Sequence, residues 1–199
     1  MEENVNKESG YTVYLAGELF DLKHLAGNAL LAESLSAVSN GKYRPVLPQD
    51  LELPSLEAKA IRDADYVALL NCDAAIFQFD GSDLDSGTVA EFMTAKFADI
   101  PSVLLRTDFR RSGDRGANPW NLMCESFPRT ESLVVDTMTL YSNEMEKGWI
   151  LASEATKAVA YQLAARLVEK LNAAIATSVG LSESENLEAR RLIWKTYDL

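Results

Sequence analysis

The chain contains few of the residues that build disulfide frameworks and metal centres. Its 199 residues include two cysteines, Cys72 and Cys124, and one histidine, His24. Two cysteines cannot form the disulfide framework of a small secreted domain, and these three side chains do not have the spacing of a zinc site. We therefore expect reduced thiols, no metal centre and a cytoplasmic location.

Long apolar runs and an excess of positive charge are also missing. No run of about 18 apolar residues is present, so we expect no transmembrane helix. Residues 1–10 are polar and acidic, unlike a secretory signal, and we expect this segment to be disordered or loosely ordered. With 19 lysines and arginines against 30 acidic residues, the net charge is −11. Such a charge disfavours nucleic acid and anionic membranes as partners.

What the chain does contain is an alternation of short apolar runs with helical patterns. The apolar runs, several of them rich in β-branched residues, predict buried strands at 11–16, 43–47, 74–79, 102–106 and 133–136. Apolar residues at helical spacing predict helices at 22–38, 56–71 and 89–98. Strands that alternate with helices predict a doubly wound α/β fold, flavodoxin- or Rossmann-like, with a parallel sheet of about five strands.

The C-terminal part of the chain has a helical pattern. Apolar residues repeat at helical spacing through an Ala-rich stretch from Trp149 to Ala176, and Ser182-x-x-Glu185 is a capping box that begins a last helix. We expect the first of these helices to pack on the sheet or on another subunit. The sequence thus predicts a single α/β domain over residues 11–199, in which 149–199 form a helical extension.

Carboxylates crowd one predicted strand–loop–helix junction, Asp80-Gly-Ser-Asp-Leu-Asp85-Ser-Gly-Thr88-Val-Ala-Glu91. Ligands of doubly wound sheets bind at the carboxyl ends of the strands, where this loop is expected to lie. Thr88-x-x-Glu91 is by itself a capping box, which gives Glu91 a structural explanation. A functional interpretation places Glu91 off the apolar stripe of its helix, where helix-end N–H groups would keep it ionised as a nucleophile.

Four segments, in order, resemble the motifs of the nucleoside 2-deoxyribosyltransferase family. They are Tyr14-Leu-Ala-Gly17-Glu-Leu-Phe20, Pro45-Val-Leu-Pro-Gln49, the stretch from Asn71-Cys-Asp73 to Glu91, and Asn118-Pro-Trp-Asn121-Leu-Met123. The resemblance covers residues 11 to about 136 and not the part after about residue 145. Each motif is weak alone, but four motifs in register are fairly specific.

The resemblance implies four catalytic residues. Glu91 matches the nucleophile that attacks C1′ of the deoxyribose, and Asp85 matches the acidic residue that holds the sugar hydroxyl beside it. Asp65 matches a carboxyl group near the nucleobase that assists proton transfer. Tyr14 matches a tyrosine that orients the nucleophile.

The resemblance also implies the residues that bind the substrate. Gly17 and Phe20 would belong to the pocket, with Phe20 as its aromatic lining, and Gln49 would contact the base. Asn121 and Met123 would enter the pocket from the adjacent subunit, so a homo-oligomer with shared active sites is implied.

The implied activity is the transfer of 2-deoxyribose between nucleobases by a retaining double displacement. Its substrates would be 2′-deoxynucleosides and free nucleobases, and it would need neither a metal nor an organic cofactor. Glycosidic cleavage with retention requires a carboxylate nucleophile and a second group that protonates the leaving group. The implied roles of Glu91 and Asp65 agree with this requirement.

Three other functions stay open from the sequence. The pattern also resembles the 2′-deoxynucleoside 5′-phosphate N-glycosidase family of hydrolases, which usually has Ser where Asp85 stands; the carboxylate favours nucleosides over their phosphates. The stretch Ser86-Gly87-Thr88-Val-Ala-Glu91 is similar to half of the Gly-Gly-x-Gly-Thr-x-x-Glu loop of phosphoribohydrolases, but the leading glycine pair is absent. A non-catalytic nucleotide-binding module of the same fold is the third.

Two loop segments receive structural expectations. The arginines that follow one predicted strand could bind phosphate, but we expect a solvated loop at Arg106, Arg110 and Arg111. The segment 118–123 has no helical or strand period, and its apolar residues would be a liability if exposed. We therefore expect burial across a two-fold subunit interface for Pro119, Trp120, Leu122 and Met123.

Overall fold

The computed structural model describes residues 10–108, 119–149, 151–178 and 180–199. Its centre is a five-stranded sheet in the order β2-β1-β3-β4-β5, in which every neighbouring pair is parallel. The strands are β1 (Tyr11–Ala16), β2 (Tyr43–Val46), β3 (Ala74–Gln78), β4 (Ser102–Arg106) and β5 (Thr130–Val134). This strand order is that of a flavodoxin-like doubly wound sheet, so the predicted fold class is confirmed.

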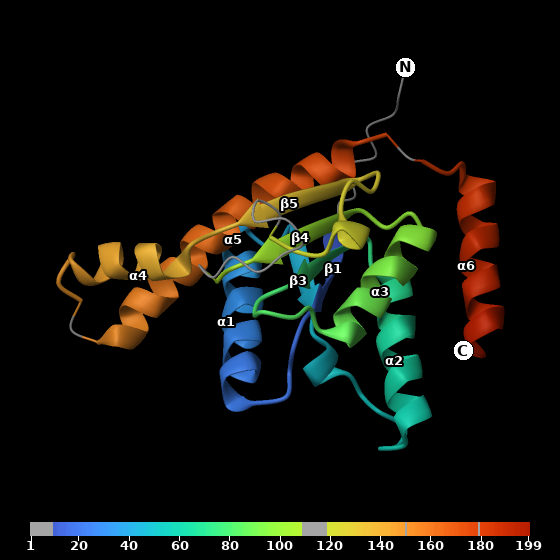
Figure 1. Cartoon of the computed structure of the whole chain (residues 1–199), viewed down its shortest axis with the longest axis horizontal. Helices are drawn as coiled ribbons and strands as arrows, with labels where there is room; N and C mark the ends of the chain where they lie inside the picture. The colour runs from blue at the N-terminus through green and yellow to red at the C-terminus, as the bar shows by residue number, and fades with distance from the viewer. Residues whose placement is uncertain (1–9, 109–118, 150, 179) are drawn as a thin grey trace.

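Helices cover both faces of the sheet (Figure 1). One face carries α1 (Leu22–Val38) and α5 (Ala152–Ala176), and the other carries α2 (Ala58–Asn71), α3 (Ser86–Phe97) and, outside them, α6 (Glu183–Tyr197). The helix α4 (Thr137–Met145) packs on α5 at the end of the molecule. Two short 3-10 helices, η1 (Pro48–Asp50) and η2 (Leu122–Cys124), lie in the loops.

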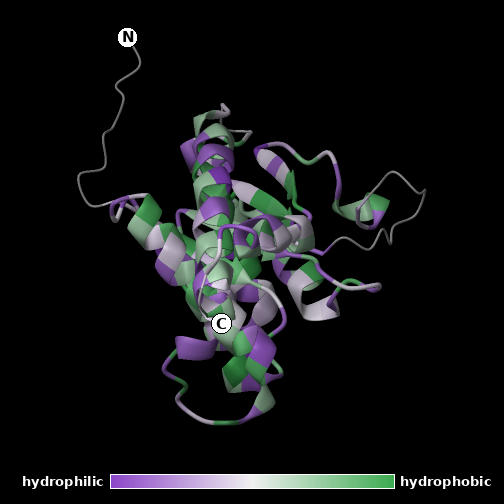
Figure 2. Ribbon diagram, turned by 90° about the vertical axis from the view of Figure 1, so that its left-hand side faces the viewer, coloured by the Kyte–Doolittle hydropathy of each residue, from purple (hydrophilic) through white to green (hydrophobic). Residues whose placement is uncertain are grey.

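Alternate residues of the strands fill two separate cores. On β1, Val13 and Leu15 face the core beneath α1 and α5, whereas Tyr14 and Ala16 face the core beneath α2 and α3. Both faces of the central strands are therefore apolar, which explains their nearly continuous hydrophobic runs. Figure 2 shows hydrophobic residues gathered along the sheet and hydrophilic ones on the outer faces of the helices.

One predicted strand is shifted in the structure, and one helix of the structure was not predicted. The last strand begins at Thr130, three residues before the prediction, because β5 is an edge strand whose first half is polar and only partly covered. The helix α4 was not predicted, because its apolar residues form no buried stripe and only Glu144 is buried in it.

The C-terminal region follows its sequence pattern. The apolar positions of α5 are buried against α1, β4 and β5, so this helix packs on the sheet of its own chain. The helix α6 begins at the predicted capping box, with Ser182 as its N-cap. Nearly all of the N-terminal segment expected to be loosely ordered, residues 1–9, lies outside the described residues. None of the helices in the described ranges is long and apolar enough to cross a membrane.

Candidate active site

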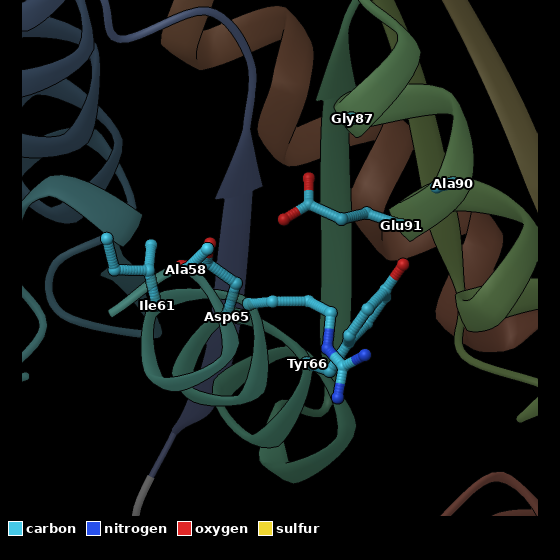
Figure 3. Close-up of a pocket in the computed structure, with 8 residues that line it drawn as sticks. Ala58, Ile61, Asp65, Tyr66, Gly87, Ala90 and Glu91 are labelled. Carbon is cyan, nitrogen blue, oxygen red and sulfur yellow. The ribbon is translucent and has the colours of Figure 1, made fainter. Parts of the chain in front are cut away.

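A cavity of about 370 Å³ opens between α2 and α3, at the carboxyl ends of the strands (Figure 3). From α2 it is lined by Ala58, Ile61, Arg62, Asp65 and Tyr66, and from α3 by Gly87, Ala90 and Glu91. Both sets recur at three- and four-residue spacing, so each forms one face of its helix. Small residues on the two facing surfaces leave the gap between the helices open.

Glu91 reaches into this gap from the second turn of α3 and is held there by β1. The hydroxyl of Tyr14, a buried residue at the centre of the sheet, donates a hydrogen bond of 2.7 Å to Oε1 of Glu91. Figure 3 shows Glu91 extending from α3, with Asp65 on the facing helix. The structure thus brings together Tyr14, Asp65 and Glu91, three of the four residues predicted to be catalytic.

The surroundings of Glu91 favour its neutral form. Burial, together with the charges of Asp65 and Asp85, raises the pKa of Glu91 to about 7, although the hydrogen bond from Tyr14 lowers it in part. Burial also raises the pKa of Asp65 to about 6. Burial, and next the charge of Glu91, raise the pKa of Tyr14, so this phenol stays a neutral donor.

The prediction that helix-end N–H groups keep Glu91 ionised is wrong. Glu91 is the sixth residue of α3, beyond the first turn with its free N–H groups. The ionised form is stabilised by Tyr14 instead.

Asp85 is the N-cap of α3. Its Oδ2 accepts hydrogen bonds from the backbone N of Thr88 at 2.7 Å and from Oγ1 of Thr88 at 2.8 Å. The predicted capping box of Thr88 and Glu91 is therefore wrong, because the cap lies three residues earlier and Thr88 is buried inside the helix. A Cβ on Gly87 would lie 3.1 Å from Oδ2 of Asp85, so the absence of a side chain leaves room for this carboxylate.

A second, smaller cavity of about 60 Å³ lies at the same edge of the sheet. Its lining is polar and consists of Asp85 together with Glu18, His24, Asn28, Gln78 and Asp80. His24 pairs through Nε2 with Glu18 at 2.9 Å. Within the described residues, no group of three or more His, Cys, Asp or Glu side chains could hold a metal ion.

Three residues predicted to bind substrate lie near this edge but outside the linings of both cavities. Gly17 follows β1, and a Cβ on it would lie 3.3 Å from Cβ of Gln78. Gln49 accepts a hydrogen bond of 3.3 Å from Asn28, a residue that lines the smaller cavity. Phe20 is 77% exposed and covers no site in this chain.

The segment expected at a subunit interface divides into a buried and an exposed part. Trp120 is 1% exposed and belongs to the core beneath α2 and α3, so its predicted place in an interface is wrong. Asn121 caps η2, where its Oδ1 accepts from the backbone N of Met123 at 2.9 Å, and Met123 is 76% exposed. Asn118 lies outside the described residues.

The expectation of a solvated loop is wrong for Arg106. This side chain is buried, donates to the carbonyl oxygens of Gly81 and Pro119, and pairs with Asp108. It thereby connects the loop after β3 to the loop after β4. Arg110 and Arg111 lie outside the described residues.

Sequence reasoning missed the contribution of α2 other than Asp65. Ala58, Ile61 and Arg62 share a helix face with Asp65, and the spacing of three, four and seven residues was a signal that could have found them. The smaller cavity had no such signal, because its lining comes from four separate segments.

A family model described as nucleoside 2-deoxyribosyltransferase matches residues 13–133, more than half of the chain. The chain belongs to this family. No curated protein matches the chain.

Solved structures of similar shape include a conserved protein from Enterococcus faecalis V583, with 20% identity and a TM-score of 0.50 over 82% of this chain and 98% of that chain. A 2-desoxiribosyltransferase from Leishmania mexicana has 22% identity and a TM-score of 0.48, over 70% of this chain and 99% of that one. A CMP N-glycosidase from Clostridium botulinum has 13% identity and a TM-score of 0.44, over 68% of this chain and 98% of that one. At its level of identity, the first likeness concerns the fold alone.

Proposed function

We propose that this member of the nucleoside 2-deoxyribosyltransferase family transfers 2-deoxyribose between nucleobases, with Glu91 as the nucleophile. The observation that carries the proposal is the hydrogen bond of 2.7 Å from Tyr14 to Glu91, inside a cavity whose facing helix presents Asp65. A buried, oriented carboxylate facing a second carboxyl group is the arrangement that glycosidic cleavage with retention requires.

In the proposed first step, the ionised carboxylate of Glu91 attacks C1′ of a 2′-deoxynucleoside. The bond from C1′ to the base nitrogen breaks, its electron pair passes to the base, and the protonated carboxyl group of Asp65 supplies a proton to the base. The deoxyribose is then an ester on Glu91. In the second step a nitrogen of another base attacks C1′, Asp65 takes up the proton, and Glu91 is released as a carboxylate.

Asp85 and the smaller cavity are the proposed site for the sugar hydroxyls. Asp85 lies close enough to Glu91 for its charge to raise the pKa of that carboxyl, and it lines the smaller cavity with Glu18 and Asp80. Three carboxylates around this cavity would repel a 5′-phosphate. We therefore propose nucleosides rather than their 5′-monophosphates as substrates.

The exposed part of the segment at 121–123 is proposed to complete the pocket of another subunit. Asn121 and Met123 lie on the surface of their own chain, outside the linings of both cavities. An exposed methionine beside the exposed Leu122 is an apolar group suited to contact with a second copy. The active enzyme would then be a homo-oligomer.

The proposed reaction is tested by incubating the protein with a 2′-deoxynucleoside and a different free base. A new nucleoside is the expected product, and Glu91→Ala should abolish its formation while an ester adduct on the wild-type protein appears by intact mass. Asp83→Ala, which removes an exposed carboxylate of the same loop, is the matched control and should retain activity. Release of free base without transfer would replace the proposal with a hydrolase, and no reaction at all would point to a binding module.

A further inference from the structure

The face of α2 opposite Glu91 has the composition of a base-binding surface. Its lining residues are two apolar side chains, Ala58 and Ile61, followed by Arg62, Asp65 and Tyr66. Under the proposed function, on which this inference rests, C1′ must lie beside Glu91. The base attached to C1′ then occupies the larger cavity along α2, because the smaller, polar cavity beside Asp85 suits the sugar.

Arg62 is anchored at one side of its guanidinium group. Its Nε and Nη2 donate to Oδ1 of Asp63 at 2.9 and 2.5 Å, and Nη2 also donates to the carbonyl oxygen of Tyr197 at 2.8 Å. Its Nη1 makes no hydrogen bond within the described part of the chain. The C-terminal turn thus holds Arg62 in place and leaves two N–H donors for a ligand in the cavity.

We infer that Arg62 selects the base by donating hydrogen bonds to a carbonyl oxygen at C6 of a purine. The two free N–H groups of Nη1 can only donate, and hypoxanthine and guanine present an acceptor, the carbonyl oxygen O6, at C6. Adenine has an amino group at C6, which presents a donor to the donors of Arg62. The enzyme therefore prefers 6-oxopurines to adenine.

The experiment compares deoxyinosine with deoxyadenosine as donors, since the two differ in their bases at C6 and N1. We expect wild-type kcat/KM to be higher for deoxyinosine, and Arg62→Gln to reduce this ratio at least about fivefold, mostly through KM for deoxyinosine. Lys59→Gln is the matched control. Lys59 also contacts Asp63 and the carbonyl oxygen of Asp198, but it does not line the cavity, so its loss should leave the ratio unchanged.

The outcomes separate this inference from the proposed function. If wild-type protein transfers deoxyribose but Arg62→Gln keeps the wild-type ratio, or Lys59→Gln changes it equally, the inference is overturned while the transferase stands. An equal loss on both donors would also overturn it, since that result assigns Arg62 a structural role. Failure of the wild-type protein to act on any nucleoside would refute the proposed function itself.

Discussion

Glu91 and Asp65 must hold opposite protonation states in the proposed reaction. Glu91 must be ionised to attack, although its pKa is about 7. Asp65 must be protonated to donate, although its pKa is about 6. Because the base has the higher pKa, only a minor fraction of the protein holds this combination. The rate should therefore follow a bell whose rising limb lies near pH 6, whose falling limb lies near pH 7 and whose maximum lies between them.

Tyr14 sets the height of this bell and the position of its falling limb. Its hydroxyl stabilises the ionised form of Glu91 and so lowers the pKa of that group. Tyr14→Phe should therefore lower the maximum of kcat/KM and move the falling limb to higher pH, which a pH profile with a 2′-deoxynucleoside would measure.

Tyr43→Phe is the control for this prediction. Tyr43 is also a buried strand tyrosine, and it packs on the opposite face of the sheet. Its hydroxyl donates a hydrogen bond to Asn172, which the variant loses. Its substitution should leave the height and the falling limb of the bell unchanged. A Tyr14→Phe profile with the wild-type height and falling limb would show that Glu91 is not the group that must ionise.

At the scale of the element, the start of α3 combines a structural and a proposed chemical role in one residue. Asp85 caps the helix through Thr88, lines the smaller cavity, and raises the pKa of Glu91 through its charge. An asparagine caps a helix as well as an aspartate does, whereas alanine does not. The two roles can therefore be separated by substitution.

Asp85→Ala should lower the free energy of unfolding by about 0.5–2 kcal/mol, and Asp85→Asn should leave it nearly unchanged. Both variants should lose most transfer activity, because both lack the carboxylate proposed to hold the sugar. Thermal or urea unfolding and the transfer assay provide the two measurements. An Asp85→Asn protein that is as active as wild type would remove Asp85 from the proposed site.

The elements that the sequence predicted well are those whose local pattern matches their burial. β1, α1 and β4 have the predicted bounds, because these central strands are largely apolar and the helix boundary coincides with a capping aspartate. β5 and α4 were shifted or missed, because polar edge elements carry little hydrophobic signal.

Local pattern could not predict the site. Tyr14 and Glu91 lie 77 residues apart in sequence, and only the resemblance to a family joined them. The burial of Arg106 could not be predicted either, because its partners belong to two other loops. Contacts between loops form only once the strands are assembled into the sheet. The sequence pattern of a single segment therefore does not predict them.

At the scale of the whole molecule, the pocket of one chain is open on the side away from the sheet. α2 and α3 supply its two walls, while Phe20, Leu122 and Met123 lie exposed on the surface. Exposed apolar side chains are suited to contact with a second copy, which is the role proposed for the segment at 121–123. This arrangement makes a prediction about mixtures of inactive variants.

Glu91→Ala and Asn121→Ala proteins should each be nearly inactive, and a mixture allowed to exchange subunits should regain activity. In a mixed dimer, one pocket receives Glu91 from one subunit and Asn121 from the other, and so has both wild-type residues. Mixing Glu91→Ala with Asp85→Asn is the control, because both residues belong to the same chain's pocket and no mixed pocket is complete. Subunit exchange is followed by mass-tagged chains. Exchange without recovery, or a protein that elutes as a monomer while fully active, would leave Asn121 and Met123 as surface residues and place the whole site within one chain.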